Sequence, residues 1–88
     1  MEAVWVFNGG GTFPAAVFGT RERAEVWIAD RHLSGTLTKY PVDISAYDWA
    51  IASGSFRPTR PDQSEPRFIA RFSSASQEHY HYTDGSLE

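Results

Sequence analysis

The chain of 88 residues can bury only one modest core, and its 15% aromatic content supplies large side chains for that core. The absence of cysteine excludes a disulfide framework, a thiolate zinc site and a catalytic thiol. The net charge of −3 argues against sequence-independent nucleic-acid binding, and neither a signal peptide nor an apolar run of membrane-spanning length is present, so we expect a cytoplasmic protein without a membrane partner.

The N-terminal third predicts a β-hairpin followed by a helix. Residues 3–8 form an apolar run typical of a strand covered on both faces, and the glycines of 9–11 indicate a turn into a second strand within 12–18. Thr20 is a candidate N-cap for a helix over 21–32, in which Ala24, Trp27 and Ile28 share one apolar stripe.

A third strand is expected over residues 36–42, where Pro41 stops it. Ser45 and Asp48 then resemble a helix cap, and the following residues predict a two-turn helix that Gly54 ends. We expect Trp49 to dominate the buried side of this helix, with Tyr47 nearer the rim.

The last third predicts a loop and two strands. Residues 56–66 contain three prolines and indicate an irregular loop, whereas alternation over 67–72 favours a strand. Alternation over 78–83 predicts a strand with His79 and His81 on one face and Tyr80 and Tyr82 on the other.

Together these elements predict an α+β fold in the order β-β-α-β-α-β-β. A mostly antiparallel sheet of four to five strands would carry two helices on one face. Residues 1–85 are interpreted as a single domain, and residues 86–88 as a candidate expression-tag remnant.

Three stretches, "VFGTRERAEVWI", "LSGTLTKYPVDISAYDWAI" and "RFSSASQEHYHYTDG", carry a resemblance to a known family. The chain resembles a family of small bacterial domains of unknown function, over nearly its whole length. The resemblance implies this fold class and a bacterial source, and it implies no activity.

The histidines and arginines are the candidate binding residues. His79 and His81 would point to the same side of a strand, but zinc needs a third protein ligand, so we assign no metal and no cofactor. Four arginines lie within residues 57–71 and are candidates for phosphates or an acidic partner: Arg57, Arg60, Arg67 and Arg71.

Composition favours a non-enzymatic interaction module of the immunity or regulator kind, bound to another protein or to a second copy, with Tyr47 and Trp49 as candidate contacts. A small-molecule binder or small enzyme that uses Tyr40, Asp43 and Asp48 with the two histidines is the first alternative, although no catalytic residue is assigned. Weak nucleic-acid binding through the four arginines is the second.

Overall fold

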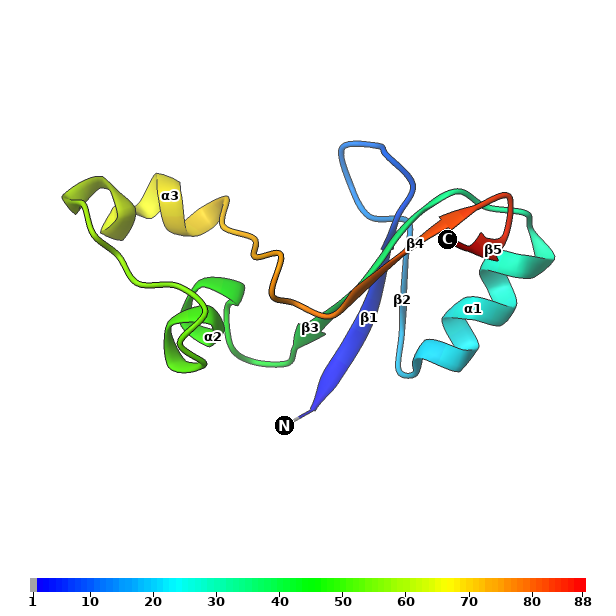
Figure 1. Cartoon of the computed structure of the whole chain (residues 1–88), viewed down its shortest axis with the longest axis horizontal. Helices are drawn as coiled ribbons and strands as arrows, with labels where there is room; N and C mark the ends of the chain where they lie inside the picture. The colour runs from blue at the N-terminus through cyan, green and yellow to red at the C-terminus, as the bar shows by residue number, and fades with distance from the viewer. Residues whose placement is uncertain (1) are drawn as a thin grey trace.

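The computed structural model describes residues 2–88, and its centre is a five-stranded antiparallel sheet (Figure 1). The strands follow the spatial order β2-β1-β3-β4-β5. Their bounds are β1 Ala3–Asn8, β2 Ala16–Phe18, β3 Gly35–Pro41, β4 His79–Thr83 and β5 Ser86–Leu87. The α+β prediction and the antiparallel sheet are confirmed.

One face of the sheet and helix α1 (Arg21–Asp30) enclose the main core. Thr20 caps the helix, because its side chain accepts a hydrogen bond from the backbone N–H of Arg23. Ala24 and Ile28 point inward and are fully buried, as the apolar stripe predicts. The sheet contributes residues that alternate along its strands toward the helix: Trp5, Phe7, Leu37 and Tyr82.

The opposite face of the sheet has no helix over it within residues 2–88. Val4 and Val6 of β1 are only partly buried, and Val17 of β2 is 61% exposed. The prediction that β1 is covered on both faces is therefore wrong. An apolar run is ambiguous here, because valine is favoured in strands on a half-solvated face as well. We call this surface the open face, and it also carries Thr36, Thr38, Tyr40, His79 and His81.

The chain between β3 and β4 forms a separate group of short helices, which we call the helical lobe (residues 45–72). It contains α2 (Ala46–Ala52), the 3-10 helix η1 (Pro61–Ser64) and α3 (Pro66–Ala70). Ser45 caps α2 by accepting a 2.9 Å hydrogen bond from the N–H of Asp48, so this predicted cap is confirmed.

The strand predicted over residues 67–72 is wrong, because residues 66–70 form helix α3. Pro66 occupies the first turn, where a missing N–H costs nothing and the fixed φ suits a helix. Phe68 and Phe72 then lie four residues apart and reach the same side, which a strand would also have given them. The spacing of these two residues fits both a helix and a strand, so the sequence pattern did not decide between them.

The molecule is elongated, with extents of 45 × 26 × 20 Å. Its radius of gyration is 14.3 Å, whereas a compact chain of this length would have about 12 Å. Figure 1 shows the helical lobe at one end of the long axis and α1 at the other. Of the two helices expected on one face, α1 covers the sheet, whereas α2 contacts it mainly through β3.

Residues 86–88 take part in the sheet. Ser86 and Leu87 pair with Thr83 and Tyr82, and the N–H of Glu88 donates to the carbonyl of His81. Residues 86–88 were interpreted as a candidate tag remnant, whereas Ser86 and Leu87 form the edge strand β5.

Candidate interaction surfaces

Four aromatic rings form the small core of the helical lobe: Tyr47, Phe56, Phe68 and Phe72. Their ring centroids lie 4.9–6.2 Å apart, the separation at which aromatic pairs attract. Tyr47 is 7% exposed, and its hydroxyl donates a 2.7 Å hydrogen bond to the carbonyl of Gln63. The three phenylalanines are only half-buried, so this core is open on one side.

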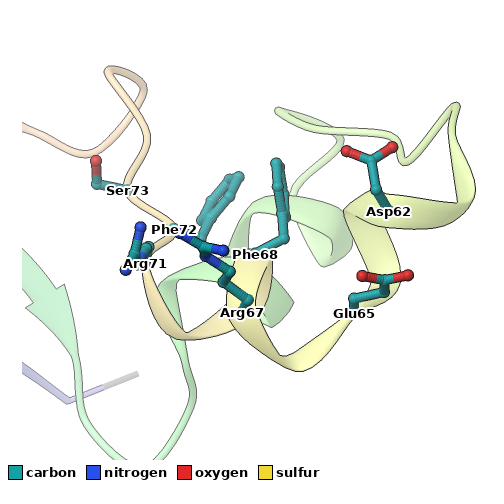
Figure 2. A pocket seen from close by; sticks show the side chains of 7 residues that line it. All are labelled: Asp62, Glu65, Arg67, Phe68, Arg71, Phe72 and Ser73. Carbon is teal, nitrogen blue, oxygen red and sulfur yellow. The ribbon is translucent and has the colours of Figure 1, made fainter.

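That open side forms a hollow of about 490 Å³. We call it the aromatic hollow, and Figure 2 shows the side chains that line it: Asp62, Glu65, Arg67, Phe68, Arg71, Phe72 and Ser73. The Phe68 and Phe72 rings project in the same direction between two charged ends. Arg67 and Arg71 lie at one end, and Asp62 and Glu65 lie at the other.

Arg67 and Arg71 are exposed and, within residues 2–88, neither forms an ion pair. Arg67 in α3 and Arg71 at its C-cap carry like charges four residues apart, so a bound anion would relieve their repulsion. At the opposite end Asp62 is already paired with Arg60, at 3.2 Å. The hollow therefore offers an apolar floor with a free positive end.

The four arginines of the sequence prediction do not form one surface. Arg67 and Arg71 line the hollow, Arg60 is held by Asp62, and Arg57 lies exposed outside the lining. The structure therefore brings together two of the four.

Trp49 lies on the opposite side of α2 from the aromatic cluster. It is half-buried and lines a second hollow of about 330 Å³, together with Pro41 of β3 and Glu78 beside β4. The expectation that Trp49 dominates the core and Tyr47 lies at the rim is therefore wrong. Helix α2 packs against the α3 segment of the same lobe, and this contact buries Tyr47 in place of Trp49.

His79 and His81 lie side by side on the open face, as predicted. Both are exposed, and their ring centroids are 5.4 Å apart. The Nδ1 atom of His79 is 2.7 Å from the carbonyl oxygen of Gln77, and that of His81 is 3.3 Å from the hydroxyl of Thr36. Each Nε2 atom is left without a hydrogen bond among the described residues.

The small-molecule alternative requires Tyr40, Asp43 and Asp48 beside these histidines. Tyr40 shares the open face with them, but Asp48 lies in the first turn of α2, where it accepts a hydrogen bond from the Ser45 hydroxyl, and Asp43 lies in the segment before that helix. Neither hollow is lined by any of these three residues or by the histidines. The structure does not bring the five side chains around one cavity.

A family model described as a domain of unknown function (DUF7710) matches residues 4–88. The chain belongs to this family. The match includes both the sheet and the helical lobe, so the DUF7710 model treats them as one unit. No curated protein and no solved structure matches the chain. Within residues 2–88 of this DUF7710 domain, no helix combines the length and apolar character needed to cross a membrane.

Phe68 and Phe72 were not predicted from the sequence to line a hollow of this DUF7710 domain. Their four-residue spacing directly after Pro66 was the available signal, because proline at a first helical position favours a helix over a strand. Their contacts with Tyr47 and Phe56 join residues that are distant in the sequence, so no local pattern predicts them.

A polar cluster fixes β4 against α1 on the covered side of the domain. Glu25 accepts hydrogen bonds from Arg21 and from the hydroxyl of Tyr82. Burial first, and the bond to Glu25 second, raise the pKa of Tyr82 to about 12. Arg21 also lies over the ring of Tyr80, 3.6 Å from its centroid. These groups are used within the fold, so they do not form a binding site.

Proposed function

We propose that the domain is a protein-interaction module that binds a segment of another protein in the aromatic hollow. The observation that carries the proposal is the half-covered ring pair Phe68 and Phe72 beside two arginines without ion-pair partners in residues 2–88. Phenylalanine and arginine are both enriched in protein interfaces, and arginine is also enriched among the residues that contribute most to binding energy. We infer no catalytic role.

The chemistry of the hollow defines the segment. An apolar side chain would cover the phenylalanine rings, and a carboxylate would meet Arg67 and Arg71, since guanidinium groups bind carboxylates in a bidentate manner. The partner segment is therefore acidic and apolar together. A bacterial cytoplasmic setting belongs to the proposal, with support from the family resemblance and the cysteine-free composition.

A peptide array with systematically varied charge and apolar content tests this proposal. The wild-type domain should retain peptides in which Asp or Glu neighbours Leu, Phe or Trp. The double variant Arg67→Glu with Arg71→Glu should lose them. The double variant Arg23→Glu with Arg31→Glu makes the same change in net charge at two exposed positions, one in α1 and one at its C-cap, so it serves as the matched control.

Equal loss in both double variants would show that net charge alone controls binding and would overturn the proposal. Retention of single-stranded oligo(dT) instead of peptides, with affinity that falls steeply with salt, would also overturn it in favour of nucleic-acid binding. A conservative variant, Phe68→Leu, should weaken peptide binding while α3 remains helical.

A further inference from the structure

The His79–His81 pair has features of a ligand set that go beyond two exposed histidines. Both rings project from β4 on the open face, and residues two apart on a strand point to the same side. The ring centroids are 5.4 Å apart and the planes are 88° from parallel. Histidines at this spacing on one face of a strand can chelate a single ion.

The hydrogen bond at His79 selects the tautomer that binds metal. A carbonyl oxygen only accepts, so the 2.7 Å contact with Gln77 means that Nδ1 of His79 carries the proton. In the neutral ring the lone pair is then on Nε2, which faces away from this bond. Metal-binding histidines have this same support, a second nitrogen that donates to a carbonyl or carboxylate.

The supporting carbonyl is itself fixed. Gln77 is 2% exposed, and its side chain donates to the carbonyl of Lys39 and accepts from the N–H of Ser74. The Nδ1 atom of His81 has a weaker contact, 3.3 Å from the Thr36 hydroxyl, and this hydroxyl can accept from Nδ1 when His81 takes the same tautomer as His79. One ring is thus rigidly oriented and its neighbour is held loosely.

We propose that His79 and His81 bind a divalent transition-metal ion through their two Nε2 atoms, with Cu²⁺ preferred over Ni²⁺ and Zn²⁺. The preference follows from the general order of affinities for nitrogen ligands. No group of three or more His, Cys, Asp or Glu side chains within residues 2–88 has metal-binding geometry, so the site is an open one. Water molecules or donor atoms of another chain would fill the remaining coordination positions of the ion.

Calorimetric titration of the untagged domain with CuSO₄, NiCl₂ and ZnCl₂ tests the site, with MgCl₂ as a hard-cation control. Thr36→Val should weaken Cu²⁺ binding by about tenfold, the usual effect of losing a supporting hydrogen bond. His79→Ala or His81→Ala should weaken it further. His32→Ala removes the remaining histidine, which lies at the end of α1, and should leave the affinity unchanged.

Electron paramagnetic resonance of the Cu²⁺ complex gives a readout independent of affinity. Two coordinated imidazole nitrogens should be visible in the wild type and one in either single variant. A stoichiometry of one chain per ion and a stoichiometry of two chains per ion both support the site. The value shows only whether water or a second chain fills the remaining coordination positions.

Three results would overturn the proposal. These are equal affinity in the wild type and His79→Ala, loss of binding in His32→Ala, and a spectrum with oxygen ligands only. Both histidines are exposed, so the variants should keep the wild-type melting temperature, and a changed affinity can be read as loss of a ligand.

Discussion

The hydroxyl of Tyr82 in β4 donates a 2.7 Å hydrogen bond to Oε2 of Glu25 in α1. This bond joins the two sides of the main core, and it favours the neutral phenol because ionised Tyr82 would face a carboxylate at close range. Burial of the side chain acts in the same direction and is the larger cause.

Alkaline pH should therefore destabilise the domain through Tyr82. The pKa is about 12 in the folded chain and about 10 in the unfolded chain, so the folded state holds the proton more tightly. Its stabilisation is complete below pH 10 and is lost as the pH rises to about 12. Urea unfolding across this range should show a steeper loss in the wild type than in Tyr82→Phe, and the late tyrosinate absorbance should vanish in the variant. Parallel curves would contradict the assignment.

Tyr47→Ala should destabilise the helical lobe by about 3–5 kcal/mol, because it removes the ring shared by three phenylalanines. Trp49→Ala should cost about 1–2 kcal/mol, since that side chain is only half-buried. Hydrogen exchange distinguishes the two regions. Amides of α2 and α3 should lose protection in Tyr47→Ala, while those of β1 and β3 keep most of theirs. A larger effect from Trp49→Ala would reverse this assignment of the core.

Gly35→Ala should destabilise the sheet by about 1–3 kcal/mol. A Cβ atom at this position would lie 2.5 Å from the carbonyl oxygen of Asn8 and 2.7 Å from the ring of Phe7. Gly19→Ala is the control, because nothing lies within 4 Å of a Cβ there. Thermal melts that respond equally to the two substitutions would show that β1 and β3 do not approach this closely.

Gln77→Glu should destabilise the domain by about 2–3 kcal/mol at pH 7, because the new carboxylate would face the carbonyl of Lys39 without a donor. Burial beside a carbonyl raises the pKa of the new carboxyl above its unfolded value, so the deficit relative to wild type should shrink as the pH falls toward about 4.3, where the protonated carboxyl can donate again.

Gln63→Glu is the matched control for that experiment. Its Oε1 atom already accepts from the backbone N–H groups of Thr59 and Arg60, so a carboxylate keeps both bonds. Both substitutions replace an amide by a carboxylate, but their effects on the free energy of unfolding should differ in sign or size. Equal urea midpoints would show that the Gln77 side chain does not donate to Lys39.

Local signals in the sequence predicted the parts of the fold that depend on neighbours along the chain. The caps Thr20 and Ser45 and the bounds of β1 were predicted from patterns of a few residues. The side-by-side placement of His79 and His81 followed from the two-residue period alone.

Features that depend on tertiary contact were not predictable in this way. Trp49 and Tyr47 both suit a buried helix face, and only the position of α3 decides between them. The aromatic hollow depends on that same contact, so its lining could not be assembled from the sequence. Within residues 2–88, Arg67 and Arg71 form no ion pair, and Asp62 pairs with Arg60, which is likewise a tertiary outcome.

The helical lobe is inserted between two strands that are direct neighbours in the sheet. The chain leaves β3 at Pro41 and returns to β4 at His79, and its two ends are joined by the bond from the N–H of Lys39 to the carbonyl of Glu78. Each doubling of a loop's length costs only about 0.6 kcal/mol in closure entropy. The hairpin of β3 and β4 can therefore tolerate lobes of very different size. A change in the length of the lobe should therefore leave the pairing of β3 with β4 and the packing of α1 on the sheet intact.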